Sequence, residues 1–262
     1  MRRVRILITG GSGRLGRTLV PLLSAAGHSV RVLSRVPRTG PGPQVSHVVG
    51  DLTTGAGLTE SIADIDVIVH LASDSRNARA VDVEGTQRLV EVARAARVKQ
   101  LLYVSIVGID RIPFRYYECK LEAERLLAES GVPFSILRAT QFHSFVALLL
   151  NEASRYPFIM PIPSGFFVQS VAIEEVAVRL CRAVNEGPNG MLRDFGGPEV
   201  LPIEEAATAW ISRFRPYVGL WAIPIYLPGK IAEAFRAGYN TCPDGERGTE
   251  TWREWLKRSM TV

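Results

Sequence analysis

Short apolar or alternating runs are separated by amphipathic stretches along the first half of the chain. The runs are typical of strands buried in a sheet, and they cover 4–8, 29–33, 45–49, 67–71 and 101–104. Between them apolar residues recur at helical spacing, as at Leu15, Leu19 and Leu23 and again over 82–96. This alternation predicts an α/β fold, a doubly wound parallel sheet of Rossmann-like type with helices on both faces.

The second half continues this pattern and then changes. The sequence predicts strands over 132–137 and 191–196, and helices over 116–130, 141–151, 173–184 and 203–214. The segment 156–167 holds four aromatic residues, three prolines and a glycine, which indicates an irregular connection. After Pro216 helices are expected over 230–239 and 249–257. We therefore expect a Rossmann domain over 1–215 and a small helical part over 216–262 that covers the substrate side of the sheet.

A glycine-rich turn, TGGSGRLG over 9–16, joins the first strand to the first helix. Gly10 permits a tight turn, Gly13 lets the backbone approach a pyrophosphate, and Gly16 lets the helix lie close to the strand. The N–H groups and the positive dipole at the helix N-terminus favour a phosphate. The turn therefore predicts a dinucleotide site, with contacts from Gly10, Gly13, Arg14, Leu15 and Gly16.

The end of the second strand indicates which dinucleotide binds. An NAD site places an acid about 20 residues past the glycines, whereas an NADP site offers an arginine there. Here the strand ends in Ser34 and Arg35, no acid precedes Asp51, and Arg14 adds a second cation. The sequence therefore predicts NADP(H), and we interpret Arg38 as a solvated surface cation.

Further cofactor contacts are expected where the later strands end. Asp51 is either an acceptor for the adenine amine or a turn residue, and Leu52 follows it. Ala72 and Ser73 end the strand over 67–71, and their small side chains leave room for a cofactor.

Tyr116 and Lys120 are candidates for proton transfer. They lie four residues apart on a predicted helix, so their side chains share one face. A cation beside a phenol lowers its pKa from about 10 and brings it into the range of acid–base catalysis. Ser105, after the strand over 101–104, completes the candidate set. The alternative is an amphipathic helix that carries an incidental tyrosine and lysine.

Composition narrows the classes of function. The 262 residues are 47% hydrophobic and 22% charged, as in soluble globular proteins. The net charge of +5 comes from cations scattered among acids, so a nucleic-acid partner is not expected. Three cysteines without a C-x-x-C pair or a histidine cluster predict no metal site and a reduced, cytoplasmic location. No targeting segment and no apolar run of membrane-spanning length is apparent, so no membrane partner is expected.

Several motifs, taken in order, resemble the short-chain dehydrogenase/reductase superfamily in its atypical, NmrA-like branch. They are TGGSGRLG, HLAS, YVSIVGID, YYECK and VPFSILRATQFH, followed by the tail AFRAGYNTCPDGERGTETWREWL. The resemblance implies that Tyr116 donates or accepts the proton, that Lys120 holds the nicotinamide ribose and lowers the pKa of Tyr116, and that Arg35 reads the 2′-phosphate.

The resemblance also places substrate-pocket residues after the strand over 132–137. They are Gln141, Phe142 and His143, although a lone histidine among apolar residues is more often part of the core. Two features depart from the family pattern. The family serine falls where this chain has Ile106 or Val107, and the spacing from Ser105 to Tyr116 is short.

These observations lead to an NADPH-dependent reductase of a small carbonyl or quinone. An apolar C-terminal part indicates an apolar or aromatic substrate, and the expected state is a monomer or homodimer. The alternative is a catalytically weak, NADP(H)-binding redox sensor that acts on a protein partner. An epimerase or dehydratase is a third option, which the short tail disfavours.

Overall fold

The chain forms two compact units, each assembled from separate segments. The computed structural model describes residues 3–38, 42, 44–156, 158–216, 219 and 221–259. Unit 1 comprises 1–105, 115–138 and 176–192, and unit 2 comprises 106–114, 139–175 and 193–262. These boundaries differ from the expected division at residue 215, because the segments that follow the fifth and sixth strands already belong to unit 2.

Unit 1 is built on a parallel sheet. Its strands are β1 (Arg5–Thr9), β2 (Ser29–Ser34), β3 (Val45–Val49), β4 (Val67–His70), β5 (Gln100–Ile106) and β6 (Phe134–Ala139), in the order β6-β5-β4-β1-β2-β3. In the centre Ile6 pairs with Val30 on one side and Val67 on the other, and Leu7 and Ile8 are fully buried. The doubly wound α/β fold predicted from the apolar runs is therefore confirmed.

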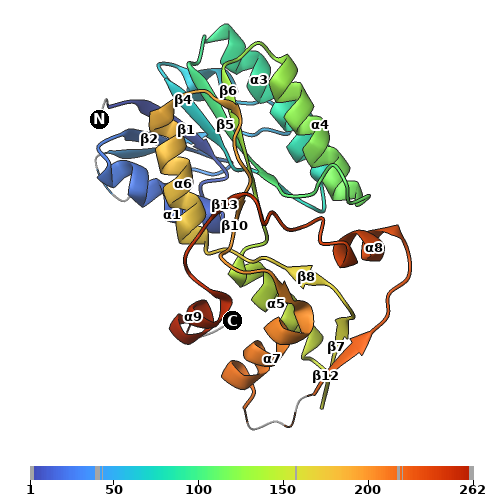
Figure 1. Ribbon diagram of the computed structural model, residues 1–262. Coiled ribbons are helices and arrows are strands. Elements are labelled where there is room, and N and C mark those ends of the chain that lie inside the picture. The colour runs from blue at the N-terminus through green and yellow to red at the C-terminus, as the bar shows by residue number, and fades with distance from the viewer. Residues whose placement is uncertain are drawn as a thin grey trace. The chain divides into compact units, whose positions relative to one another are not determined.

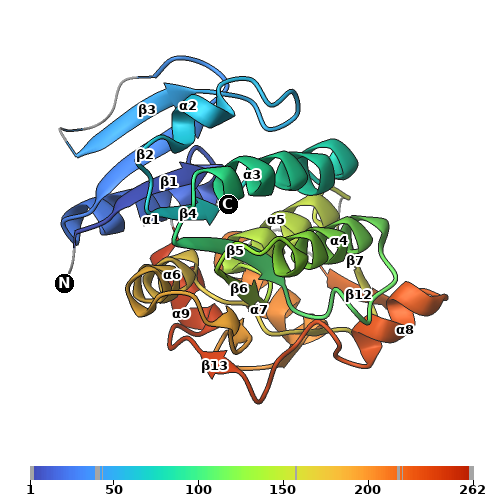
Figure 2. The ribbon, with the colours of Figure 1, turned by 90° about the horizontal axis from the view of Figure 1, so that it is seen from above.

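Helices cover both faces of this sheet (Figures 1 and 2). Helices α3 (Gly85–Ala95) and α4 (Arg115–Glu129) lie on one face, and α1 (Arg14–Ala25) and α6 (Ile173–Glu186) lie on the other. The helix predicted over 82–96 is confirmed as α3 over most of its length, and its first residues belong to a π-helix, η1 (Arg79–Glu84), that continues into α3. A short helix, α2 (Leu58–Ile62), was not predicted.

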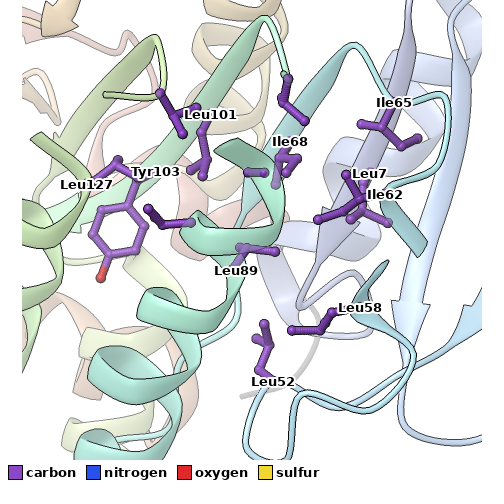
Figure 3. Close-up of a cluster of buried hydrophobic side chains, with 14 of the residues drawn as sticks. Leu7, Leu52, Leu58, Ile62, Ile65, Ile68, Leu89, Leu101, Tyr103 and Leu127 are labelled. Carbon is purple, nitrogen blue, oxygen red and sulfur yellow. The ribbon is translucent and has the colours of Figure 1, made fainter. Parts of the chain in front are cut away.

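The core between the sheet and α3 and α4 is made of large aliphatic side chains (Figure 3). Leu89 of α3 and Leu127 of α4 are fully buried, as are Ile68 and Leu101 of the sheet. Burying a side chain of this size contributes about 1.5 to 3 kcal/mol each. This packing fixes α3 and α4 on the sheet and so fixes the side chains they carry toward the strand ends.

A buried amide ties β5 to a much later part of unit 1. Gln100 is 2% exposed, and its Nε2 donates to the carbonyl oxygens of Ala183, at 3.0 Å, and Gly187, at 2.9 Å. Directly after them, β9 (Gly190–Met191) pairs with β6. The last segment of unit 1 is thus held by hydrogen bonds to the sheet interior.

Unit 2 contains shorter elements. They are α5 (His143–Ala153), β7 (Ile159–Pro163), β8 (Phe167–Val168), β10 (Phe195–Gly196), β11 (Leu201–Pro202), α7 (Ile203–Phe214), β12 (Trp221–Ile225), α8 (Lys230–Arg236), β13 (Glu246–Arg247) and α9 (Trp252–Arg258). A second core surrounds the buried Trp210 and Trp252. Helix α9 begins with a capping box in which Thr251 and Glu254 bond each other's backbone N–H groups.

Two predictions for the second half of the chain were wrong in detail. The segment 156–167, expected to be irregular, contains β7, which pairs in parallel with β12; Pro157 lies outside the described residues. Met160 and Ile162 are buried, which gives β7 the alternation of a strand. The single strand expected over 191–196 is two short strands, β9 and β10. In the part of the chain that the structure describes, no helix has the length and apolar character needed to span a bilayer.

Candidate functional site

The glycine turn after β1 has the backbone that its sequence predicts. Gly10 has φ of +69°, and a Cβ there would lie 2.6 Å from the backbone N of Ala72. The turn is therefore packed directly against the end of β4. A Cβ on Gly16 would lie 2.5 Å from Cα of Gly11, so α1 starts in close contact with the turn. Neither contact can be relieved by moving a flexible side chain.

The turn leaves the N-terminus of α1 open to an anion. Gly13 is the N-cap, no side chain caps the helix, and the first turn holds no acid. A Cβ on Gly13 would meet only the carbonyl oxygen of Gly10, at 3.2 Å. First-turn N–H groups without intrahelical acceptors and the helix dipole favour a phosphate. This cradle fits the diphosphate of a dinucleotide, which Gly10, Gly13 and Gly16 would hold together with Arg14 and Leu15 of the same turn.

The two glycines should respond differently to a methyl group. Gly16→Ala is expected to lower the free energy of unfolding by about 1 to 3 kcal/mol, because its Cβ overlaps backbone. Gly13→Ala should cost less than about 1 kcal/mol but weaken dinucleotide binding, because the methyl group lies where the phosphate approaches. Urea unfolding and calorimetric titration measure the two effects. Equal stability of all three proteins would contradict the packing described for Gly16.

A hollow of about 230 Å³ lies beside the turn, at the end of β2. Ser34, one of the predicted cofactor contacts, lines it, and two arginines, Arg17 and Arg38, supply positive charge. The other lining residues are Gly11, Ser12, Val20, Pro21, Val32, Leu33, Val45 and His47. Arg14 and Arg35, the cations chosen from the sequence, are exposed and are not among the lining residues. Arg38 is exposed, as the sequence interpretation expected, and it also lines the hollow.

Asp51 and Leu52 have local structural contacts. The Asp51 Oδ1 accepts from the backbone N and from the Oγ1 of Thr53, both at 2.7 Å, as a turn residue does. These hydrogen bonds lower the pKa of the Asp51 carboxyl. Leu52 is 7% exposed and belongs to the core under α3. An adenine contact by either residue stays a prediction.

Tyr116, at the start of α4, is held by a side chain from the end of β4. Its hydroxyl lies 2.7 Å from the Oγ of Ser73, and that Oγ donates to the Oδ1 of Asp82 at 2.6 Å. Asp82 belongs to η1 and is fully buried. The sequence selected Tyr116 and Ser73 for separate reasons, and the structure brings them together. It also adds Asp82, whose only signal in the sequence is an acid within an apolar helical pattern.

Lys120 lies one turn further along α4 and is buried. Its Nζ donates to the carbonyl oxygen of Val104 at 2.9 Å and lies 3.7 Å from the Oδ1 of Asp82. The same nitrogen lies 4.1 Å from the centre of the Tyr103 ring. Burial lowers the pKa of Lys120 to about 8, although the charge of Asp82 acts in the opposite direction. At neutral pH Lys120 is therefore mostly a cation.

The pKa of Tyr116 shifts in the direction opposite to the expectation. Burial raises the pKa of Tyr116 to about 12, and the charges of Asp82 and Asp74 add to this. The phenol is consequently protonated at neutral pH and is a potential proton donor. Lys120, which was expected to lower this pKa, is not among the main causes of the shift.

Ser105 differs from the position expected for it. Strand β5 continues to Ile106, so Ser105 lies inside the strand rather than beyond its end. It is 2% exposed, and within the described residues its Oγ has no hydrogen-bond partner. The serine that contacts Tyr116 is instead Ser73, which lies in the segment after β4.

The predicted substrate residues belong to unit 2. The side-chain amide of Gln141 donates to the carbonyl oxygen of Asn240 at 3.3 Å, and Phe142 is half-buried. His143 is buried: its Nδ1 lies 2.8 Å from the Oγ of Ser170 and its Nε2 lies 3.1 Å from the carbonyl oxygen of Glu250. The histidine has the contacts of a core residue, the alternative that its sequence context left open.

Comparison with known proteins gives the family. Residues 10–182 match a family described as NAD(P)H-binding. A 3-beta-hydroxysteroid dehydrogenase from Mycolicibacterium neoaurum is 32% identical over 159 residues, 48% of this chain and 43% of that protein. The photosystem II assembly factor Ycf39 of Synechocystis is 28% identical over 147 residues, 53% of this chain and 45% of that protein. The chain thus spans about half the length of these curated relatives.

A solved structure extends the likeness to nearly the whole fold. The NADPH-dependent quinone oxidoreductase QOR2 of Escherichia coli, complexed with NADPH, superposes with a TM-score of 0.82 at 17% identity, covering 97% of this chain and 99% of that one. At this identity the likeness shows a shared Rossmann-like fold. With its glycine turn, its open helix N-terminus and the match over residues 10–182, the chain belongs to the NAD(P)H-binding family.

Proposed function

We propose that the protein is an NADP(H)-dependent oxidoreductase that reduces a small carbonyl or quinone. The observation that carries the proposal is the cluster of Tyr116, Ser73, Asp82 and Lys120, joined through contacts of 2.6 to 3.7 Å at the strand ends of an NAD(P)H-binding domain. A dehydrogenase among the relatives and a quinone oxidoreductase among the structures of the same fold support this class of reaction.

Tyr116 serves as the acid in this proposal. Bound NADPH supplies a hydride from C4 of the nicotinamide. Tyr116, with a pKa of about 12, is protonated at neutral pH and gives its proton to the substrate oxygen. Because Tyr116 stays protonated around neutral pH, its ionisation should not change the rate of reduction there. The reverse oxidation needs the phenolate, so its rate should rise about tenfold per pH unit below a pKa of 12.

Lys120 contributes a buried positive charge next to the acid. Its Nζ carries three protons, of which the carbonyl oxygen of Val104 accepts one. We assign the others to the ribose hydroxyls of the cofactor and to Asp82. The resemblance to short-chain dehydrogenases supports this assignment. An apolar or aromatic substrate completes the proposal, and we expect a monomer or homodimer in the cytoplasm.

The hollow beside Ser34 supports a preference for NADP(H). A charge-assisted hydrogen bond to the 2′-phosphate is worth on the order of 1.5 to 3 kcal/mol, so NADPH should bind at least about tenfold more tightly than NADH. Arg38→Ala and Arg35→Ala should each reduce this preference and leave NADH affinity nearly unchanged. The effect of Arg38→Ala should be larger, because Arg38 lines the hollow.

Calorimetric titration with NADPH and NADH measures this preference. Arg125→Ala, which removes an exposed cation from α4, is the matched control. Equal affinities of the unaltered protein for the two cofactors would refute the preference. If NADPH were still bound more tightly than NADH by both Arg38→Ala and Arg35→Ala, other residues would have to bind the 2′-phosphate.

NADPH oxidation against a panel of aldehydes, ketones and quinones tests the reductase itself. The expected result is turnover with at least one apolar or aromatic carbonyl or quinone, lost in Tyr116→Phe.

A second candidate is a dinucleotide-binding sensor that acts on a protein partner. The orphaned hydroxyl of Ser105 favours it, as does the similarity to an assembly factor. Tight NADPH binding without turnover across the whole panel would favour this second function.

A further inference from the structure

The proposed reaction assigns roles to Tyr116 and Lys120 and leaves Asp82 and Ser73 without one. The carboxylate of Asp82 is fully buried, although burying an ionised group is costly unless it is paired and hydrogen-bonded. Its Oδ1 accepts from the Oγ of Ser73 at 2.6 Å, and its Oδ2 accepts from the backbone N of Asp74 at 3.1 Å. Lys120 is the nearest cation, at 3.7 Å. These contacts orient the carboxylate toward the strand end that carries Ser73.

The contacts of Ser73 set the direction of the hydrogen bond to Tyr116. A serine hydroxyl has one proton, and an ionised carboxylate can only accept. Since Ser73 donates to Asp82, it must accept at its contact with Tyr116, 2.7 Å away. The phenol O–H therefore points to Ser73. The chain of donors runs from Tyr116 to Ser73 and from Ser73 to Asp82.

We propose that Asp82 is a positioning residue that acts through Ser73 on the phenolic proton of Tyr116. Asp82 holds the only proton of Ser73, so Ser73 presents a lone pair to the phenol and keeps its O–H in place. This inference rests on the proposed function only where it concerns turnover. The hydrogen-bond chain itself is a property of the folded protein.

The same chain of hydrogen bonds explains how the Tyr116 phenolate is stabilised after proton transfer. The O–H bond of Tyr116 breaks and an O–H bond forms on the substrate oxygen, which the hydride from the reduced nicotinamide has made basic. Ser73 can then turn its proton from Asp82 to the phenolate. Ser73 is exposed, so water can return a proton to the phenolate beside it. Ser73 would thus take the position that the expected family serine does not fill in this chain.

The negative charge of Asp82 affects Tyr116 separately from the hydrogen bonds that its shape allows. Together with burial, this charge raises the pKa of Tyr116. Other ionisable groups that interact with Tyr116, Asp82 or Lys120 come from several elements: His70 of β4, Asp74 after β4, Tyr103 of β5, and Tyr117, Cys119 and Glu124 of α4. Lys120 is the one cation in direct contact with Asp82 among the ion pairs of the described residues. Replacing Asp82 with a neutral side chain of the same shape therefore separates the effect of its charge on Tyr116 from the effect of its packing.

Nuclear magnetic resonance of protein labelled with ¹³Cζ-tyrosine tests the inference without requiring turnover. Tyr116→Phe identifies the Tyr116 resonance by its loss. Ser73→Ala is expected to shift that resonance at neutral pH, because the phenol loses its acceptor. Asp82→Asn should lower the pKa at which the resonance titrates by roughly one unit or more, because a nearby negative charge is removed. Glu129→Gln, at the far exposed end of α4, makes the same charge change and should leave the titration unaltered.

Two outcomes would overturn the inference: a Tyr116 resonance unchanged by Ser73→Ala, or a titration unchanged by Asp82→Asn. Ser73 is exposed, so its variant remains informative even if Asp82→Asn does not fold. Where the wild type turns over, kcat should fall up to about 10²-fold in both variants, with KM for NADPH little changed. If the resonances move as expected but no substrate is reduced, the proposed function fails and the hydrogen-bond chain stands.

Discussion

Tyr116→Phe is expected to lower NADPH-dependent turnover by about 10²- to 10⁴-fold while NADPH affinity persists. The ring that packs at the start of α4 is retained, and only the hydroxyl that contacts Ser73 is lost. Steady-state kinetics and calorimetric titration separate the two effects. The size of the loss is the usual contribution of a general acid, which Tyr116 is in the proposed reaction.

Tyr117→Phe is the matched control for this experiment. It removes a phenol hydroxyl from the next residue of the same helix, and Tyr117 is also largely buried. Turnover in this control should stay close to that of the unaltered protein. Undiminished turnover in Tyr116→Phe would exclude Tyr116 as the acid, and an equal loss in both variants would indicate damage to α4 rather than to the chemistry.

Lys120→Met is expected to lower the free energy of unfolding by about 3 to 5 kcal/mol. Methionine keeps the length of the side chain but leaves Asp82 as a buried charge without a cation. The double variant Lys120→Met with Asp82→Asn should recover much of the loss, because no uncompensated charge then remains. Urea unfolding of the single and double variants gives the coupling between the two residues. NADPH affinity should fall in both, because the proposed ribose contact is absent.

Lys99→Met is the control for Lys120→Met, because it removes the cation of an exposed ion pair. Lys99 lies 2.7 Å from the Oδ1 of Asp66, a shorter contact than that of Lys120, but its side chain is 64% exposed. An exposed pair is worth about 0 to 1 kcal/mol, so the expected loss is much smaller. If Lys120→Met cost no more than Lys99→Met, the buried pair would not stabilise the fold as described.

The sheet of unit 1 could be predicted because its strands are buried on both faces. Such strands are continuous apolar runs, as over Val67–His70, and their alternation with helices admits few topologies. Strands β7 and β12 lacked this signal. Pro161, Pro163 and Pro224 lie inside them, and proline is tolerated only where a strand has an unpaired edge. A two-stranded sheet provides such edges, and the sequence alone does not reveal it.

The candidate site was predicted in part. Tyr116 and Lys120 followed from helical spacing, and the phosphate turn followed from three glycines. Asp82 was missed because it lies in a π-helix, whose wider turn changes which residues face the sheet. The direction of the Tyr116 pKa shift was missed for another reason. It depends on burial and on Asp82, and neither can be read from the spacing of a tyrosine and a lysine.

Two hydrogen bonds of Gln100 can form only late in the synthesis of the chain. The amide emerges from the ribosome well before Ala183 and Gly187, whose carbonyl oxygens it needs. At 5 to 20 residues per second, β5 waits for about 4 to 17 seconds without these two acceptors, and until then its amide has only the longer contact with the Oγ of Ser135, at 3.4 Å, among the hydrogen bonds of the described residues. During this interval the nascent sheet is exposed to chaperones and to misassembly. The first 170 residues, although they contain the whole glycine turn and the Tyr116 cluster, should therefore not form a stable domain by themselves.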